Sequence, residues 1–533
     1  MAGYTLQSFS GIAPKIAPKN LALELATAAQ NVRLDRGRLE PFRGITESEV
    51  VGSTVESLFP YQGSWITSTD DVDYVGSILP NDVREQIFYT DEEYPKIRSG
   101  AQIFRLGIPR PASAPSIGAY TAGDDTRAYV CTYVDAWGYE GAPSDPSNVI
   151  SAEDGTSVTL GLPGFPAGNH NFDINAKVRV YRVNTGDTGA VYQYVGEAGT
   201  GDVGWPNFTD SVPNSQLQEA LPSEEWTGPP DDDTALHPDG PLRGLIELTN
   251  GALCGFSGNT VYFSEPYIPT AWPASYRISG QEQIVGLAET SQGIIVGTTG
   301  VPWLLVGAHP EAMSRVELPI VQACSSKNSL VDMGDYALYA SPDGLVSLSG
   351  NDATLVTDEY FSKDEWQQYS PDTIRAFRHE EKYYAFYGAT ANGTGFCFDP
   401  RGGKNAFVEL TGFEISRGYS DPETGEAYVI YDEGGARKIG SFETGAELEY
   451  TWKSKEFVSP NYQMFSVARV EATVYPVTLR VIGDGYDVDT IVFYDDKPVR
   501  LPTSDRARVW QFEVTGKGRV IYFGCWDAMA EVV

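Results

Sequence analysis

The feature of this 533-residue sequence that most constrains its fold is a repeat that runs from about Pro241 onward. Each repeat unit consists of short apolar strands separated by turns such as Asn250-Gly251. The five units begin at Leu245, Ile284, Ser329, Ile374 and Ile415. A spacing of roughly 40–45 residues is typical of four-stranded propeller blades. An earlier segment, Val55–Asp91, has the same character and would supply another blade. We therefore predict an all-β fold that contains a β-propeller of about six blades. The alternative interpretation is a set of unrelated meanders in a sandwich.

Changes in sequence texture divide the rest of the chain. Residues 1–50 hold a predicted helix over Asn20–Val32, which is rich in helix-favouring Leu, Ala and Glu, and then a hairpin that turns at Asp35-Arg36-Gly37. Residues 51–112 would form the first blade or blades, and residues 223–449 the remaining blades. Residues 450–533 are predicted to form a C-terminal β-rich domain.

The segment 113–222 differs from its neighbours and is predicted to be an inserted β-sandwich. Its strands alternate apolar and polar residues, and turns recur at short intervals, as a small sandwich requires. The stretch "YVDAWGYEGAPSDPS" is typical of a fibronectin type III-like domain at the point where a strand meets a Pro-rich loop. The Pro- and Asp-rich stretch Pro222–Asp233 is predicted to be the linker that leads back to the propeller.

The charge of the chain limits its partners. With 72 acidic and 38 basic residues the formal net charge is −34, so the surface repels nucleic acid phosphates and anionic lipid.

The five cysteines are far apart, which predicts free thiols and assembly in a reducing compartment. No apolar run is long enough to span a bilayer, and the N-terminus lacks a signal-peptide pattern. We therefore expect a soluble protein.

No sequence motif points to catalysis. The four histidines lie outside any zinc-hydrolase pattern, and no nucleophile elbow, P-loop or dinucleotide-binding fingerprint occurs. The triplet Asp231-Asp232-Asp233 would suit calcium, but adjacent like charges more often mark a solvated linker. Nothing singles out a carboxylate pair for glycoside hydrolysis. We predict no catalytic residue, no cofactor and no metal site, and hence a protein that is not an enzyme.

The segment Phe263–Tyr276, "FSEPYIPTAWPASY", combines three prolines with four aromatic rings. Proline cannot donate to a β-ladder, so the segment is predicted to connect two blades. Its rings Tyr267, Trp272 and Tyr276 are candidates for a structural strap. A ligand platform is the alternative, and a protein–protein contact is compatible with either.

Four stretches resemble one family of virion proteins. They are "SGIAPKIAPKNLALELATAAQNVRLDRGRLEPFRG", "YFSEPYIPTAWP", "VQACSSKNSLVDMGDYALYASPDGLV" and "WKSKEFVSP", and together they span most of the chain. They are similar to the tail nozzle, or tail tubular protein B, of short-tailed bacteriophages. The resemblance implies a propeller-based homo-hexameric ring in the phage tail, assembled in the host cytoplasm. It also implies contacts with the head-to-tail adaptor and with tail fibres or spikes, and genomic DNA that passes through the channel without specific binding.

The resemblance gives the basic cluster Arg33, Arg36, Arg38 and Arg43 an expected role. We expect these arginines to meet acidic neighbours between subunits of the ring. The alternative function is a propeller-type glycan-binding or glycan-hydrolysing protein for receptor recognition. That alternative predicts aromatic and carboxylate side chains that converge on one propeller face.

Overall fold

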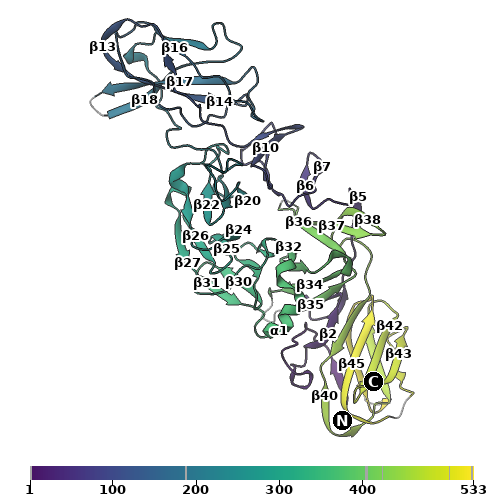
Figure 1. The fold of residues 1–533 in the computed structure, drawn as a ribbon. Coiled ribbons are helices and arrows are strands. Elements are labelled where there is room, and N and C mark those ends of the chain that lie inside the picture. Colours follow the sequence, from purple (N-terminus) through teal and green to yellow (C-terminus); the bar gives the residue numbers. More distant parts are fainter. Residues whose placement is uncertain are drawn as a thin grey trace. The chain divides into compact units, whose positions relative to one another are not determined.

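The computed structural model describes residues 3–186, 189–401, 406–422, 424–502, 505–529 and 532. The chain divides into two compact units, whose ribbon is shown in Figure 1. Unit 1 comprises Met1–Thr69, Ala288–Leu304 and Glu317–Val533, and unit 2 comprises Asp70–Leu287 and Leu305–Val316.

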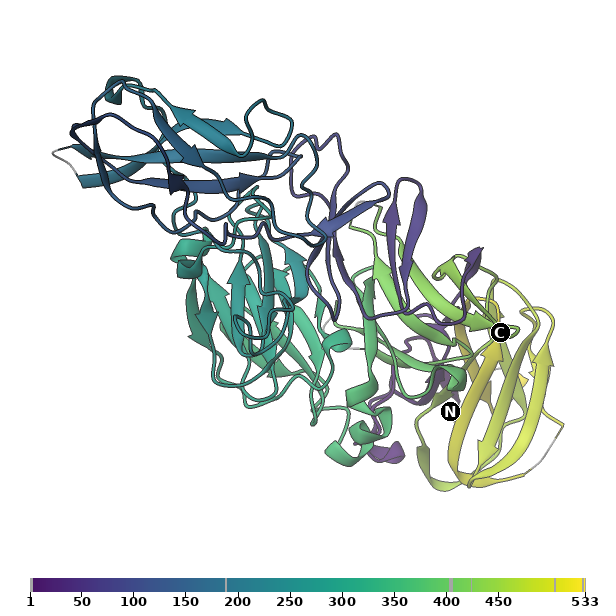
Figure 2. The same ribbon diagram turned by 45° about the horizontal axis from the view of Figure 1, so that its top comes forward.

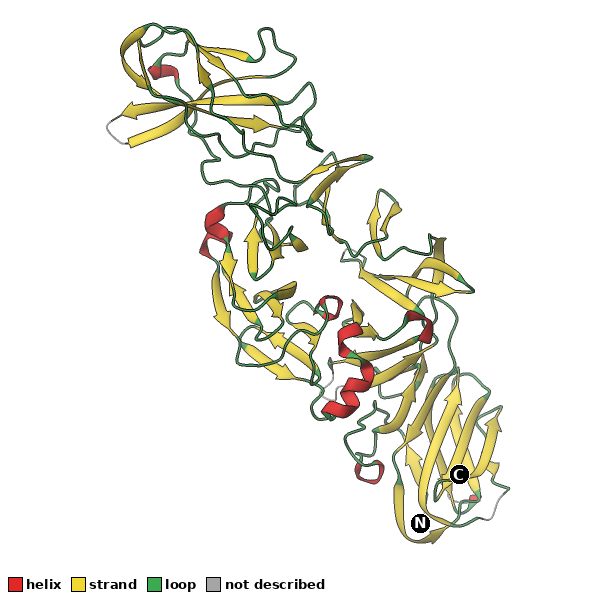
Figure 3. Ribbon diagram, in the orientation of Figure 1, coloured by secondary structure: helices red, strands yellow, loops and turns green. Residues whose placement is uncertain are grey.

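Strands dominate both units, which confirms the predicted all-β class (Figure 3). The single α-helix among the described residues is α1 (Lys363–Trp366). Ser362 and Glu365 form a capping box at its N-terminus. The other helical segments are single 3-10 turns: η1 (Pro18–Asn20), η2 (Asn214–Gln216), η3 (Ala274–Tyr276), η4 (Pro310–Ala312), η5 (Lys327–Ser329), η6 (Gln367–Tyr369), η7 (Pro371–Thr373) and η8 (Thr390–Asn392).

Unit 2 contains two four-stranded antiparallel sheets. The first consists of β8 (Asp73–Val75), β9 (Ile87–Thr90), β10 (Lys96–Ser99) and β11 (Gln102–Arg105). The second consists of β20 (Arg243–Glu247), β21 (Leu253–Ser257), β22 (Thr260–Phe263) and β23 (Ile278–Ser279). Both sheets contribute to one apolar core, in which Phe88, Leu106, Leu242 and Trp272 are buried. Every residue of β9 and β21 is buried, and both strands are mostly apolar.

Between these two sheets in the sequence, unit 2 forms three smaller antiparallel sheets. Their strands are β12 (Ser116–Ile117), β16 (Val158–Gly161) and β19 (Asn207–Asp210) in one sheet, β13 (Ala122–Arg127) and β15 (Ile150–Ala152) in another, and β14 (Tyr129–Val134), β17 (Lys177–Gly186) and β18 (Gly189–Ala198) in the third. They share a core that includes Cys131, Leu160 and Val180. These sheets lie within the segment 113–222, whose fibronectin type III-like topology stays a prediction.

A further four-stranded sheet follows β23 in the sequence. Its strands are β24 (Ile284–Thr290), β25 (Gly293–Thr298), β26 (Trp303–Val306) and β27 (Ser314–Glu317). In unit 1 the next sheet in the sequence consists of β28 (Val331–Asp332), β29 (Ala337–Ala340), β30 (Leu345–Ser349) and β31 (Asp352–Leu355). The chain then forms β32 (Arg375–His379), β33 (Lys382–Phe386), β34 (Thr394–Asp399) and β35 (Ala406–Thr411), which also pair in order.

The last sheet of this series takes its fourth strand from the beginning of the chain. Strands β36 (Ile415–Ser420), β37 (Ala427–Glu433) and β38 (Ala436–Ser441) form a meander, and β5 (Thr46–Val50) pairs with β38. A hairpin of β6 (Ser57–Tyr61) and β7 (Ser64–Ser68) follows β5. Its Trp65 ring packs edge-on against Tyr428 of β37, at 4.8 Å between centroids.

The two ends of the chain lie together in unit 1, as Figures 1 and 2 both show. Strand β1 (Tyr4–Leu6) pairs with the last strand, β46 (Val520–Trp526), and the same sheet holds β41 (Val467–Ala472) and β44 (Val499–Arg500). Strand β2 (Ala26–Gln30) lies between β35 and β39 (Tyr450–Ser454). It thereby joins the β32–β35 sheet to β39, β40 (Phe457–Gln463), β42 (Val477–Gly483), β43 (Tyr486–Phe493) and β45 (Ala507–Gly516).

The helix predicted over Asn20–Val32 is wrong, because this segment contains strand β2 and no α-helix. Asn20 ends the 3-10 turn η1 and caps no helix. Helix propensity is a weak preference that tertiary pairing overrides, and β2 has hydrogen-bonded neighbours on both sides. Ala26 and Ala29 are fully buried, so their small side chains allow close packing around the strand.

The hairpin predicted after this segment is present. Strands β3 (Val32–Arg33) and β4 (Glu40–Pro41) pair antiparallel, and Gly37 has a positive φ of 66° in the turn. The five cysteines are buried free thiols, as the sequence predicts. No helix in the described part of the chain has the length and apolar character needed to cross a membrane.

Candidate functional site

The three rings predicted in the segment Phe263–Tyr276 have different environments. Trp272 is 1% exposed, and its indole N–H donates a hydrogen bond to the Pro269 carbonyl at 2.9 Å. Tyr276 is also buried, and its hydroxyl donates to the Glu265 carboxylate at 3.0 Å. Tyr267 is half exposed and has a positive φ of 63°. The three rings therefore form no common ligand platform, and the role of Trp272 as an inter-blade strap stays a prediction.

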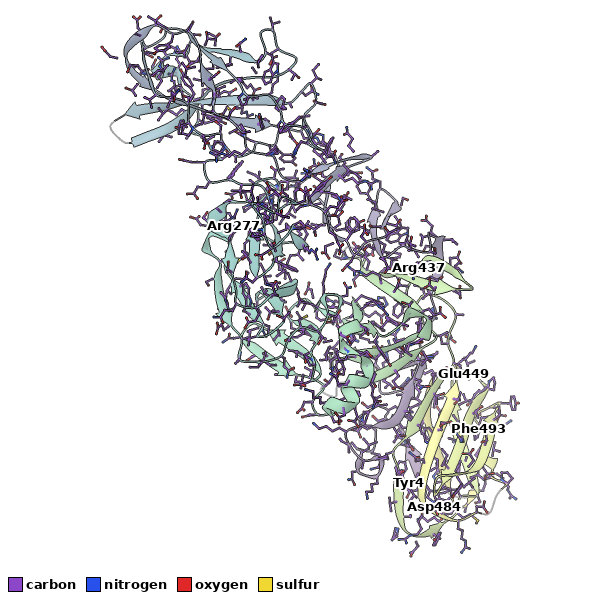
Figure 4. All side chains as sticks on the ribbon, viewed as in Figure 1. Tyr4, Arg277, Arg437, Glu449, Asp484 and Phe493 are labelled. Atoms are coloured by element: carbon purple, nitrogen blue, oxygen red, sulfur yellow. The ribbon has the colours of Figure 1, made fainter. Side chains whose placement is uncertain are left out.

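The segment is hydrogen-bonded to the linker that follows the inserted sheets. The Trp272 amide donates to the Thr227 carbonyl at 2.9 Å, and the Thr227 hydroxyl donates to the Trp272 carbonyl at 2.5 Å. Ser275 donates to the Glu225 carboxylate, and Arg277, labelled in Figure 4, donates to the Thr227 hydroxyl. The Pro-rich segment therefore fixes the backbone and side chains of the linker.

This linker forms one wall of a cavity in unit 2, which has a volume of about 680 Å³. The other walls come from the segments around β10 and β11 and from two loops of the inserted sheets. Charged, histidine and aromatic side chains supply the chemistry of the cavity lining. They are Tyr94, Arg105, Arg110, His170, Glu224, Glu225, Trp226, Asp231, Asp233, His237 and Arg277. The close approach of Gly107 to the linker allows this arrangement, because a Cβ at Gly107 would lie 2.9 Å from Pro229.

The acidic triplet at the rim of the cavity binds an arginine of its own chain. Arg105 donates two hydrogen bonds to the Asp232 carboxylate, at 2.7 and 3.0 Å, and lies 3.7 Å from Asp231. These hydrogen bonds lower the pKa of Asp232. The same guanidinium stacks over the Tyr94 ring at 3.8 Å. Arg105 thus supplies the positive charge that a calcium ion would otherwise supply to these carboxylates.

Two of the four histidines line the cavity. Burial and, secondarily, the charge of Arg105 lower the pKa of His170. Burial also lowers the pKa of His237, although its Nε2 atom lies 3.9 Å from an Asp231 carboxylate oxygen. Both imidazoles are therefore neutral at neutral pH, and each offers one donor and one acceptor.

The four arginines of the predicted basic cluster differ in their exposure and in their partners. Arg33 makes ion pairs within its own chain to Asp35, Glu380 and Glu443, at 2.7, 2.6 and 2.7 Å. Arg36, Arg38 and Arg43 are exposed. Their expected role between subunits stays a prediction.

Arg33 and Arg43 line a groove of about 500 Å³ together with Lys517 and Arg519. Glu40 lies in the same groove and pairs with Arg519 at 2.7 Å. Sequence reasoning found the N-terminal half of the groove and missed the half that the turn between β45 and β46 contributes.

One group of side chains has the spacing of metal ligands, although the sequence predicted none. Ligand atoms of His379, Glu380 and Glu443 lie within 4.8 Å of one another. The guanidinium of Arg33 makes ion pairs with both of these glutamates, so a cation of the protein already neutralises them. The group therefore serves to hold the N-terminal hairpin on the β32–β33 turn.

Comparisons with known proteins leave the family open. No family model matches the sequence, and no curated protein sequence matches it. Among solved structures, the CNH domain of AfRom2 aligns with 11% identity and a TM-score of 0.27, over 58% of this chain and 92% of that chain. The extracellular domain assigned to the hybrid two-component system BT4673 of B. thetaiotaomicron aligns with 10% identity and a TM-score of 0.22. That alignment covers 88% of this chain and 47% of the other.

Proposed function

We propose that this chain is a structural virion protein that forms the ring-shaped tail nozzle of a short-tailed bacteriophage. The proposal starts from the four stretches of sequence that resemble tail nozzle proteins. In this account the protein is not an enzyme and is located in the phage tail. It docks below the head-to-tail adaptor, helps to attach tail fibres or spikes, and surrounds the distal part of the DNA channel.

The pairing of β5 with β38 is the observation that carries the propeller part of the proposal. Five four-stranded sheets and the strands β32–β35 of a larger sheet follow one another along the chain, and β5, which precedes the first of these sheets, completes the last one. Propellers repeat such sheets radially, which leaves only short and protected edges. The completion of the last sheet by a strand from before the first sheet supports a closed ring of six blades, with the smaller sheets of 113–222 inserted after the first blade.

The charge of the chain supports a channel that DNA passes without being held. Tight binding of DNA depends on basic side chains that neutralise phosphates and release counterions. A chain with a net charge of −34 has few basic side chains to spare, and many of them are paired within the chain, as Arg33 and Arg105 are. A wall of this kind repels phosphates and lets a duplex slide.

Retention of duplex DNA by the purified protein tests this reading of the charge. We expect little or no retention in a filter-binding assay, even at low ionic strength where screening is least. The double variant Lys517→Gln/Arg519→Gln, which removes two charges from the basic groove, is the matched comparison and should behave like the native chain. Tight, salt-sensitive binding that this variant abolishes would contradict a channel that does not hold DNA.

A further inference from the structure

We propose that the cavity of about 680 Å³ in unit 2 binds a short oligosaccharide. This activity goes beyond ring formation and does not depend on it. Small-molecule sites typically have volumes of about 300–1,000 Å³ and combine apolar surface with a few well-placed polar groups. The cavity has this size, and its walls come from segments that are distant in sequence yet fixed to one another by hydrogen bonds.

The apolar part of the cavity suits the C–H face of a sugar ring. Trp226 is half buried in the wall, so part of its indole ring remains accessible. Ile108, Pro143 and Pro229 add rigid apolar surface beside it. A sugar ring has a flat apolar face and several hydroxyl groups. An indole ring can contact the apolar face, while polar side chains beside the indole form hydrogen bonds with the hydroxyl groups.

The polar part of the cavity favours a ligand that both donates and accepts hydrogen bonds. The lining includes three arginines, Arg105, Arg110 and Arg277, and four carboxylates, Glu224, Glu225, Asp231 and Asp233. A phosphate is disfavoured because the carboxylates would repel it. A hydrocarbon is disfavoured because it would displace water from the charged groups without replacing the hydrogen bonds of that water. Each hydroxyl of a neutral sugar is a donor and an acceptor, so it can bond to either kind of group. The neutral imidazoles of His170 and His237 have the same dual capacity.

The wall is held in place before any ligand arrives. The hydrogen bonds between Thr227 and Trp272 and the bond from Ser275 to Glu225 fix the linker on both sides of Trp226. Arg277 is held against the Thr227 hydroxyl and over the Tyr262 ring, at 5.3 Å from its centroid. Preorganised groups lose little conformational entropy on binding, which favours recognition of a flexible, well-hydrated ligand.

The test uses the full chain on a printed array of bacterial surface oligosaccharides, followed by calorimetry with the free form of the best-bound glycan. We expect binding by the native chain, a loss of affinity of about tenfold or more in Trp226→Ala, and a smaller loss in Arg277→Gln. Arg277 is exposed, so Arg277→Gln should leave the fold intact. This variant therefore tests the cavity even if Trp226→Ala fails to fold. Tyr486→Ala, which removes an exposed ring from unit 1, is the control and should bind like the native chain.

Three results would overturn the proposal. The first is the absence of binding to every arrayed glycan. The second is binding that both cavity substitutions leave unchanged, which would place the site elsewhere. The third is an equal loss in Tyr486→Ala, which would show that the cavity carries no specificity. Failure of the protein to form rings would count against the nozzle and would leave this test unaffected.

Discussion

At the scale of single residues, buried side chains with defined partners explain much of the local order. Trp272 fills the core that the two sheets of unit 2 share, and its indole N–H is bonded to the Pro269 carbonyl. Arg33 connects the N-terminal hairpin to the buried carboxylate of Glu443. Each of these residues can be compared with a nearby residue that is more exposed.

Replacing Trp272 should destabilise the protein strongly. Trp272→Ala removes a ring that is 1% exposed and leaves a cavity, which typically costs about 3–5 kcal/mol. Tyr267→Ala is the control, because half of that ring is exposed and its loss should cost far less. Thermal unfolding of the full chain measures both. An unchanged melting temperature in Trp272→Ala would show that the ring contributes nothing to the core.

Replacing Arg33 should destabilise the protein in a pH-dependent way. Arg33→Gln leaves the Glu443 carboxylate buried without its cation, a change that typically costs about 3 kcal/mol or more. Burial already raises the pKa of Glu443, and the loss of Arg33 should raise it further. A raised carboxyl pKa means that the folded state binds the proton more tightly than the unfolded state. The deficit should therefore be full at neutral pH and shrink as the pH falls toward that pKa.

The exposed Arg38 provides the matched control for this measurement. Arg38→Gln makes the same chemical change in the same hairpin and should cost little at any pH. Denaturant unfolding of the three proteins at several pH values gives the comparison. A deficit in Arg33→Gln that stays constant with pH would mean that Glu443 is not the group left unpaired.

At the scale of elements, the decisive contacts are strand pairings between distant parts of the sequence. Strand β5 completes the last four-stranded sheet, and β2 lies between β35 and β39. Neither pairing is visible in local sequence. The hairpin of β3 and β4 was predictable because its turn residues and its buried arms are adjacent. The segment of β2 was mistaken for a helix because its alanines favour helix and its two partners lie about 380 and 420 residues away in the sequence.

A proline at the edge of the β5 pairing should open the last sheet. The Val51 amide, immediately after β5, donates to the Arg437 carbonyl at 2.9 Å, and proline has no N–H to do so. We expect Val51→Pro to speed hydrogen exchange in β38, measured by mass spectrometry on peptides that cover Ala436–Ser441. Val51→Ala keeps the amide and is the control. Equal exchange in the two variants would mean that this pairing does not protect the sheet.

At the scale of the whole molecule, the repeat spacing in the sequence predicted the series of four-stranded sheets, but it carried no information about a binding site. The spacing is a property of the backbone plan and survives wide variation in side chains. The cavity in unit 2 was not predictable, because its lining comes from separate loops that share no motif. The linker "PSEEWTGPPDDD" signalled rigidity, but nothing in its sequence showed that the Pro-rich segment around Trp272 would hold it or that Arg105 would neutralise its aspartates.

Negative-stain electron microscopy of the purified full chain tests the central claim most directly. A nozzle protein should form closed rings with a central lumen, and class averages should show one rotational symmetry, with six-fold symmetry expected from the family resemblance. The particles should persist at moderate salt and at protein concentrations in the micromolar range. A field of separate monomers under all these conditions, with no ring in any class average, would contradict the account.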